Sequence, residues 1–317
     1  MNWDRQALIR EFGDFDWQTL PDSQGEQLDA YLDYYKLRFD KAAHHHCGFM
    51  PLGEFRIPVH YWRNQSSSRG TALMVHGYYD HVGLYTSLIS FCLSQGLDVV
   101  AFDLPGHGLA DGEPAAIRDF QLYDDVFTQL LTQVQGHTAA PLFAFGQSTG
   151  GAILVNYLLK HRITPGQNPF RDIFLLAPLI RPRGWRKARV LHPLISPVIS
   201  HLRRGVVNSS TDLQFIEFVG SHDPLQAEKL SVKWVGAMLK WVRFIEAQPA
   251  SLIAPMVVQG DHDETVDWQH NMQVLQEKFP SRELVMIPDG RHHLVNDGAA
   301  KQQIMYGHIA ERLRQAQ

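Results

Sequence analysis

One serine of this chain lies in a sequence context that is typical of a nucleophile. Ser148 is the middle residue of Gly146-Gln147-Ser148-Thr149-Gly150, which follows the apolar run PLFAF and precedes apolar residues at helical spacing. A strand, a sharp turn and a helix in this order hold a serine hydroxyl at the tip of the turn. Glycines two places away on each side let the strand and the helix approach closely. Because composition alone produces this pentapeptide often, its position after a predicted strand is what makes Ser148 a candidate nucleophile.

A serine hydroxyl needs a base that takes its proton and a carboxylate that orients the base. On sheets with this kind of turn, the order along the chain is serine, acid, histidine. Since the sequence holds 17 histidines, a downstream histidine alone says little. Two later apolar runs, Pro255 to Val258 and Glu283 to Ile287, each lead into a loop with suitable residues. The first loop contains Asp261, Asp263, Glu264 and Asp267, and the second contains His292 and His293, so the residues alone leave several pairings open.

Attack on a carbonyl also requires two backbone N–H donors that stabilise the oxyanion. One usually comes from the residue after the nucleophile, here Thr149, and the other from a loop after an earlier strand. The apolar run TALMV leads into such a loop, which begins His76-Gly77-Tyr78. We therefore expect the N–H groups of Tyr78 and Thr149 to form the oxyanion hole.

The elements that must position these residues alternate along the chain. Short apolar runs of strand length are separated by longer amphipathic stretches, which predicts a mostly parallel sheet with helices on both faces, an α/β architecture. A further strand pair is expected around residues 55–62. We expect a helical extension at residues 1–50, where Ser23 to Glu26 is typical of a helix start. The predicted strands of the parallel sheet are residues 71–75, 97–102, 141–145, 173–176, 255–258 and 283–287.

The alternation breaks between Pro178 and Ala254, which predicts a mainly helical cap at residues 179–254 inserted into a core of residues 51–178 and 255–317. Between Ile173 and Thr211 the sequence has no acidic residue, while arginines and lysines alternate with apolar side chains. Such a stretch suits contact with an anionic lipid surface. The alternative is a solvated face whose charges only keep the protein soluble. A Trp-rich helix is expected at residues 226–247, with an apolar stripe that either packs as core or lines an acyl-chain pocket.

Composition narrows the classes of protein. The 317 residues are 44% hydrophobic and carry a formal net charge of -4. A nucleic-acid ligand is therefore not expected, because binding to a phosphate backbone needs a broad basic face. The sequence begins without a signal-peptide pattern and contains no apolar run long enough to cross a bilayer, so we expect a cytoplasmic protein, with peripheral contact to the inner face of the membrane through the cap.

Cysteine and histidine usage gives little sign of a metal or a disulfide. Cys47 and Cys92 are the only cysteines and lie in unlike surroundings, so a disulfide framework is not expected. The run His44-His45-His46-Cys47 suggests a metal site at first sight, but consecutive residues do not easily converge on one ion. We expect a surface or partly buried loop there, and no metal or organic cofactor.

Several longer motifs resemble those of the monoglyceride lipase and bacterial lysophospholipase group of the α/β-hydrolases. Five motifs of the family have counterparts in this chain: H-G-x-x-(D/E)-H-x-G-x-Y, D-x-x-G-H-G, G-x-S-x-G, G-x-x-D-x-x-V and, near the end, G-A-x-H-E. Two positions differ: Gln147 stands where the family more often has histidine, and Ala110 stands where a serine is common. The resemblance implies Asp263 as the acid and His292 as the base. It covers roughly residues 55–317, and the residues that carry it are His76, Gly77, Asp80, His81, Gly83, Tyr85, Asp103, Gly106, His107, Gly108, Gly112, Gly146, Gly150, Gly260, Asp263, Val266, Asp289, Gly290 and His292.

The resemblance implies an α/β-hydrolase fold and a serine esterase that acts on monoacyl lipids, either a monoacylglycerol lipase or a lysophospholipase. An aminopeptidase or thioesterase with the same three residues is the enzymatic alternative. A non-catalytic lipid-binding protein is the alternative of another class. A dehalogenase or epoxide hydrolase is excluded, because it needs an aspartate at position 148. The residues expected to contact the substrate are Tyr79, Gln147, Trp234, Met238 and Trp241.

Overall fold

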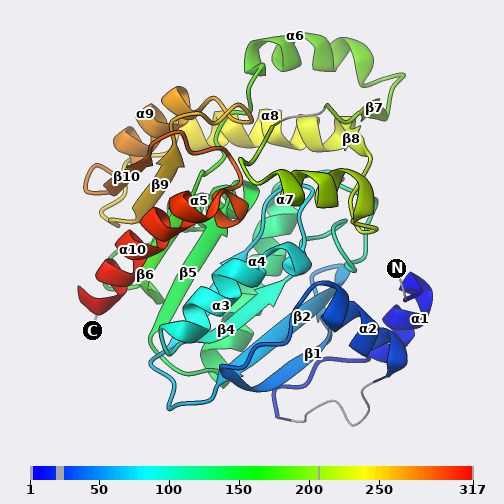
Figure 1. The fold of residues 1–317 in the computed structure, drawn as a ribbon. Coiled ribbons are helices and arrows are strands. Elements are labelled where there is room, and N and C mark those ends of the chain that lie inside the picture. The colour runs from blue at the N-terminus through cyan, green and yellow to red at the C-terminus, as the bar shows by residue number, and fades with distance from the viewer. Residues whose placement is uncertain (1–2, 19–24, 206–207, 316–317) are drawn as a thin grey trace.

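An eight-stranded sheet runs through the computed structural model, which describes residues 3–18, 25–205 and 208–315 (Figure 1). The strand order is β1-β2-β4-β3-β5-β6-β9-β10. The pairs β1–β2 and β2–β4 are antiparallel, and all later pairs are parallel. The strands are β1 (Ala42–Leu52), β2 (Phe55–Asn64), β3 (Thr71–Val75), β4 (Asp98–Phe102), β5 (Leu142–Gln147), β6 (Phe170–Leu176), β9 (Met256–Gly260) and β10 (Glu283–Ile287).

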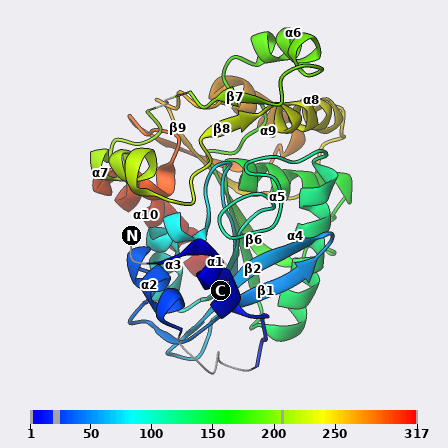
Figure 2. The ribbon, with the colours of Figure 1, turned by 90° about the vertical axis from the view of Figure 1, so that its right-hand side faces the viewer.

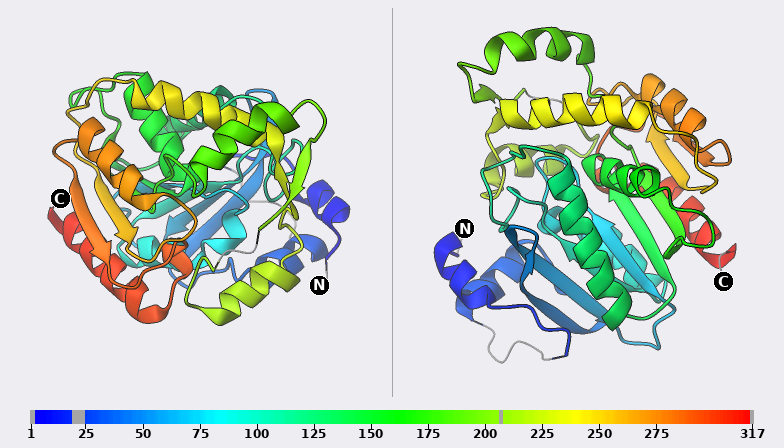
Figure 3. Two further views of the ribbon diagram at one scale, coloured as in Figure 1. Left: turned by 90° about the horizontal axis from the view of Figure 1, so that it is seen from above. Right: turned by 180° about the vertical axis from the view of Figure 1, so that it is seen from behind.

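Helices cover both faces of this sheet because its central strands are apolar on both sides. On β3, Leu73 and Val75 pack in one hydrophobic cluster, while Ala72 and Met74 pack in the other. The first cluster includes α4 (Gln121–His137), α5 (Thr149–Lys160) and α9 (Trp268–Lys278), and Figure 3 shows α4 and α5 from behind. The second cluster includes α3 (Thr86–Ser94) and α10 (Ala299–Gln315). The predicted α/β architecture is confirmed.

The N-terminal segment differs from the helical extension that we expected. It contains α1 (Arg5–Phe12) and α2 (Glu26–Tyr34), but residues from Ala42 onward form β1. Strand β1 pairs along its whole length with β2, so the helical part of the segment ends before residue 42. The histidine run at residues 44–47 is therefore part of a strand, and our expectation of a loop was wrong. Of the predicted helix start, Ser23 and Gln24 lie outside the described residues.

The segment expected to form the cap, residues 179–254, holds α6 (Trp185–Ile195), α7 (Leu213–Glu217) and α8 (Val232–Glu246). Helix α6 is outermost in Figures 1 and 2, and α8 packs against both α6 and the core helix α5. Helix α8 begins later than the predicted residue 226, because β8 (Lys229–Ser231) pairs with β7 (His201–Arg203). The Ser231 hydroxyl then accepts from Trp234 N at 3.3 Å and caps the helix.

A buried polar cluster joins the N-terminal segment to the end of the π-helix (Phe218–His222) that follows α7. The Tyr35 hydroxyl donates to Asp223 Oδ1 at 2.7 Å, and His81 Nε2 lies 2.9 Å from Asp223 Oδ2. The neighbouring Tyr34 hydroxyl donates to the carbonyl of His222 at 2.6 Å. Because the side chains of His81 and Asp223 are fully buried, these contacts fix where this part of the chain leaves the core.

Within the described ranges, each helix is either too short or too polar to cross a lipid bilayer.

Candidate active site

Ser148 stands at a strained turn between β5 and α5. Its backbone has φ 53° and ψ -111°, a combination that residues other than glycine rarely adopt. Three backbone hydrogen bonds hold the residue there. Its N–H donates to the carbonyl of Leu176 at 2.9 Å, and its carbonyl accepts from Ala152 N and Leu179 N, each at 3.0 Å. The turn therefore presents the hydroxyl at the carboxyl end of β5.

The two glycines of the motif allow this turn because neighbouring backbone occupies the space of a side chain. A Cβ atom at Gly146 would lie 2.7 Å from the backbone of Gly150. A Cβ atom at Gly150 would lie 2.0 Å from the carbonyl oxygen of Val75 on β3. Both separations are far below van der Waals contact, so any side chain would push α5 away from the sheet.

Three residues that the sequence places in distant loops meet at this turn. His292 Nε2 lies 2.9 Å from Ser148 Oγ, and His292 Nδ1 lies 2.7 Å from Asp263 Oδ2. All three residues are buried, with 6 to 7% of each exposed. With its proton on Nδ1, the imidazole donates to the carboxylate and accepts from the serine hydroxyl. An imidazole in this position can take the serine proton.

Of the four carboxylates in the loop after β9, only Asp263 points at an imidazole of the site. Its Oδ1 accepts from Thr265 N at 2.8 Å and Val266 N at 3.1 Å, which leaves Oδ2 for His292 and Gln259 Nε2. Asp261 instead lies 2.7 Å from the exposed His262. Glu264 pairs with two arginines, and Asp267 precedes α9.

The charges of the pair favour a negative Asp263 and a basic His292. Burial by itself would raise the pKa of Asp263, but the charge and hydrogen bond of His292 hold it below its ordinary value. Burial by itself would lower the pKa of His292, but the charge and hydrogen bond of Asp263 raise it above its ordinary value. The imidazole is thus a stronger base than a free one.

The loop after β3 places Tyr78 beside the nucleophile. A Cβ atom at Gly77 would lie 3.3 Å from the Cβ atom of Ser148. The Gly77 N–H donates to the Tyr85 hydroxyl at 2.9 Å, and this hydroxyl donates to Asp80 Oδ2 at 2.8 Å. Among the described residues, the N–H groups of Tyr78 and Thr149 donate to no other group. Two free backbone donors beside a serine hydroxyl suit an oxyanion.

His293, the rival base, faces away from Ser148 and takes part in a second carboxylate contact. Its ring Nε2 lies 3.1 Å from Asp80 Oδ2, and its backbone N–H donates to the carbonyl of Ser209 at 2.7 Å. Burial would raise the pKa of Asp80, but His293 and other partners lower it. Sequence reasoning missed this partnership, although Asp80 and Tyr85 were both conspicuous in the motif after β3.

Gln147 has a positioning contact that the sequence did not predict. Its side-chain Nε2 donates to the carbonyl of His292 at 2.8 Å, so the residue before the nucleophile holds the histidine loop. No sequence pattern links these two positions, because they lie 145 residues apart.

The residues expected to contact substrate fall into two groups. Tyr78 stacks on Trp234 with ring centroids 3.9 Å apart, and Tyr79 lies under the guanidinium of Arg204 at 4.0 Å. Trp234 and Tyr79 therefore lie around the Tyr78 loop. Met238 and Trp241 are buried in the same hydrophobic cluster as Trp234, and no ring contact joins them to the Tyr78 loop among the described residues. The Trp241 indole N–H donates to Asn156 Oδ1 at 3.0 Å, and its ring stacks on Phe120.

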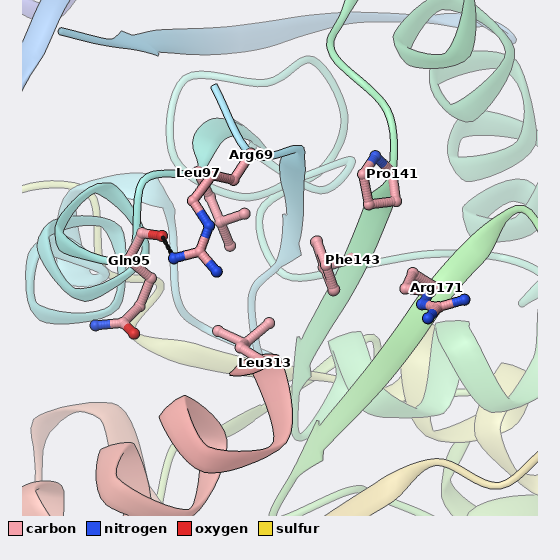
Figure 4. A pocket seen from close by; sticks show the side chains of 7 residues that line it. All are labelled: Arg69, Gln95, Leu97, Pro141, Phe143, Arg171 and Leu313. Atoms are coloured by element: carbon pink, nitrogen blue, oxygen red, sulfur yellow. Dashed lines mark hydrogen bonds between the residues drawn. The ribbon is translucent and has the colours of Figure 1, made fainter. Parts of the chain in front are cut away.

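A hollow of about 480 Å³ lies away from this site (Figure 4). Pro141, Leu97 and Phe143 line it near the amino ends of β4 and β5, whereas Ser148 follows the carboxyl end of β5. Arg69 and Arg171 approach it from its rim, and Arg69 donates to the carbonyl of Gln95 at 3.2 Å. The hollow therefore contains none of the groups described above.

Comparison with known proteins places the chain in a family. The sequence profile of the serine aminopeptidase S33 family matches residues 66–299. Monoglyceride lipase of Rattus norvegicus is 25% identical over 248 residues, which are 74% of this chain and 79% of the relative. Monoacylglycerol lipase of Mycolicibacterium smegmatis is 26% identical over 227 residues, 69% of this chain and 79% of the relative.

A solved structure supports the fold. A soluble variant of monoglyceride lipase from Saccharomyces cerevisiae, in complex with a substrate analog, matches with a TM-score of 0.70. The match covers 86% of this chain and 96% of that chain at 18% identity. At this identity the likeness shows the shared α/β-hydrolase fold.

Gly150→Ala tests the close approach at the turn. We expect it to lower the free energy of unfolding by about 3 kcal/mol, because the added methyl overlaps a backbone oxygen. Gly136→Ala is the matched control, since a Cβ atom there has no neighbour within 4 Å and the position is helical. We expect the control to stabilise by up to about 1 kcal/mol. Urea unfolding followed by circular dichroism measures both, and equal effects would contradict the steric argument.

The raised pKa of His292 sets the pH dependence of Ser148 reactivity. Only the neutral imidazole accepts a proton, so the rate of labelling by a fluorophosphonate should fall as the pH drops through this pKa. We expect the midpoint above about 6.5, the value for an unperturbed histidine. Asp263→Asn should lower the rate by on the order of 10⁴-fold and move the midpoint to lower pH. The exposed Asp261→Asn serves as control. A midpoint that is the same in the wild type and the Asp263 variant would refute this account.

Proposed function

The chain belongs to the serine aminopeptidase S33 family and is an α/β serine hydrolase, and we propose that it hydrolyses the carboxylic ester of monoacyl lipids. The substrates in view are monoacylglycerols and lysophospholipids. The observation that carries the proposal is the continuous set of contacts from Ser148 through His292 to Asp263. The two relatives named above are a monoglyceride lipase and a monoacylglycerol lipase, which supports a lipid ester as substrate.

In the proposed reaction, Ser148 Oγ attacks the acyl carbonyl while His292 Nε2 takes its proton. Asp263 keeps the imidazole in the required tautomer and stabilises its positive form. The N–H groups of Tyr78 and Thr149 stabilise the oxyanion. His292 then returns the proton to the leaving alcohol, and the acyl group stays on Ser148. Water activated by His292 releases the fatty acid and restores the serine.

The proposed acyl site lies on the Tyr78 side of the nucleophile. Trp234 of α8 stacks on Tyr78, so its ring offers an apolar wall next to the oxyanion donors. Tyr79 follows Tyr78 in the loop after β3, and Gln147 ends β5 directly before Ser148, so we place both next to the proposed acyl site. Met238 and Trp241 lie further along α8 and are buried, and we propose that they pack behind Trp234.

We also propose that α6 and the chain after it contact an anionic membrane. Val190, Leu194 and Val198 are 63, 70 and 82% exposed, which is unusual for large apolar side chains. Arg186 and Arg189 lie on the same helix and are also exposed. Exposed apolar groups next to arginines suit the boundary between headgroups and acyl chains. A cytoplasmic protein would meet this surface at the inner face of the membrane.

The family description favours one other activity, that of an aminopeptidase. The same three residues also support acyl-thioester hydrolysis. A panel of substrates separates these activities, because the reaction steps are shared and only the leaving group differs.

Ser148→Ala tests the proposed nucleophile. We expect the wild type to release fatty acid from oleoylglycerol and oleoyl lysophosphatidylcholine faster than it cleaves oleoyl-CoA or leucine nitroanilide. The variant should lose about 10⁴-fold or more in kcat, because nothing replaces the hydroxyl. Ser94→Ala, an exposed serine at the end of α3, should keep full activity. Retained turnover in the Ser148 variant would reject the mechanism, and a preference for the nitroanilide would reject the substrate class.

The membrane contact is tested with vesicles. We expect the protein to cosediment with vesicles that contain phosphatidylglycerol, and less so at high salt. Leu194→Ser with Val198→Ser should weaken binding by at least about tenfold, because two apolar side chains no longer enter the bilayer. Leu252→Ser is the control, since Leu252 is 80% exposed but lies outside α6. Equal loss of binding in the control and the double variant would contradict a specific role of α6.

A further inference from the structure

One face of the β1–β2 pair gathers two histidines and one cysteine that take no part in the serine site. Strand β1 carries His45 and Cys47, which share a face because side chains alternate along a strand. Their partners across the pair are Trp62 and His60, respectively. Side chains of consecutive residues on a strand point to opposite faces and cannot bind one ion together. Two alternate residues of β1 and one residue of β2 do point to the same face. All of them precede residue 66, where the family match begins.

The ligand atoms of this group lie close together. His45 Nε2 and His60 Nδ1 are 3.0 Å apart, and the possible ligand atoms of His45, Cys47 and His60 all lie within 4.8 Å of one another. His60 is fully buried and Cys47 is 6% exposed, whereas His45 is only partly covered. The second ring nitrogen of His60, Nε2, finds no hydrogen-bond partner among the described residues. The atoms that face one another are therefore His45 Nε2, His60 Nδ1 and Cys47 Sγ, while His60 Nε2 lies outside this group.

We propose that His45, Cys47 and His60 bind a Zn²⁺ ion. Two imidazole nitrogens and a thiolate are ligands that Zn²⁺ prefers, with bonds of about 2.0 to 2.3 Å. Tetrahedral geometry at these lengths requires about 3.3 Å between two nitrogens and about 3.6 Å between nitrogen and sulfur. The nitrogens must therefore separate by a few tenths of an ångström, and the sulfur must approach by rotation about its side-chain bond. The Cys47 thiol releases its proton to solvent as the ion binds.

The surroundings of the three ligands suit a structural ion. Trp62 stacks on both imidazoles, with centroids 4.4 Å from His45 and 5.2 Å from His60, and this restricts the rings to one orientation. Phe12 of α1 packs against His60 at 5.4 Å. The ion would join β1 to β2 beneath the N-terminal helices, which lie along these strands in Figure 2. The partly covered His45 side leaves the fourth position for water.

The site lies apart from the serine site in the sheet. Strands β1 and β2 occupy one edge, and β5, which leads to Ser148, is three places further along from β2. Loss of the ion should therefore lower stability while the chemistry at Ser148 continues. This separates the test of the ion site from any test of the hydrolase.

Zinc binding is measured on the full chain, without a histidine tag, after treatment with a chelator and dialysis. All proteins carry His262→Gln, because Asp261, His262 and Asp289 form an exposed group that also could hold a metal. We expect one equivalent of Zn²⁺ by mass spectrometry of the dialysed protein. Co²⁺ should give a sulfur-to-metal charge-transfer band, which reports a thiolate ligand.

Cys47→Ser and His60→Gln are expected to lower the affinity for Zn²⁺ at least tenfold, and Cys47→Ser should abolish the Co²⁺ band. His44→Gln is the matched control, since this exposed neighbour should leave both measurements unchanged. Fluorophosphonate labelling of Ser148 verifies that each variant is folded, and His45→Gln provides a second variant if His60→Gln does not fold. Unchanged zinc stoichiometry in Cys47→Ser, or the absence of a Co²⁺ band in the parent, would overturn the proposal.

Discussion

The short contact between His292 Nε2 and Ser148 Oγ is the interaction on which the rest of the site depends. It requires that the ends of three parallel strands, β5, β9 and β10, lie at one edge of the sheet. Parallel strands bring their carboxyl ends together, and loops at that edge then need only a few residues to place a side chain. The hydroxyl points at His292 only because the backbone of Ser148 adopts a strained conformation. Backbone hydrogen bonds with Leu176, Ala152 and Leu179 hold Ser148 in this conformation.

A second layer of polar contacts keeps those loops in register. Gln147 binds the backbone of His292, while His293 reaches Asp80 and so links the histidine loop to the Tyr78 loop. Tyr85 connects Asp80 to the backbone of Gly77. Each of these groups is buried, and a buried polar group without a partner is costly. The loops that carry His292 and Tyr78 are thus held relative to each other by buried hydrogen bonds, although Gln147 Oε1 has no partner among the described residues.

The sequence was sufficient for what depends on local pattern. The strands of the parallel sheet, the turn at Ser148 and the two loops with acid and base candidates all follow from apolar runs and glycine positions. Choosing Asp263 over Asp261 required the family resemblance, because both residues follow the same strand. What separates them is three-dimensional: Asp263 accepts from the backbone N–H groups of Thr265 and Val266, whereas Asp261 contacts the exposed His262. The strand at residues 42–52 could not be predicted either, since its pairing partner and not its own pattern decides its structure.

The N-terminal segment contacts the stretch of residues 179–254, although the family match starts at residue 66. Tyr34 and Tyr35 of the N-terminal segment bind the backbone of His222 and the carboxylate of Asp223, where the π-helix after α7 ends. Asp223 also contacts His81, which ends the loop after β3 that carries Tyr78. Burial by itself would lower the pKa of His81, but Asp223 raises it, so the two groups attract each other. One carboxylate therefore ties three parts of the chain together: the end of α2, the residues after α7 and the loop after β3.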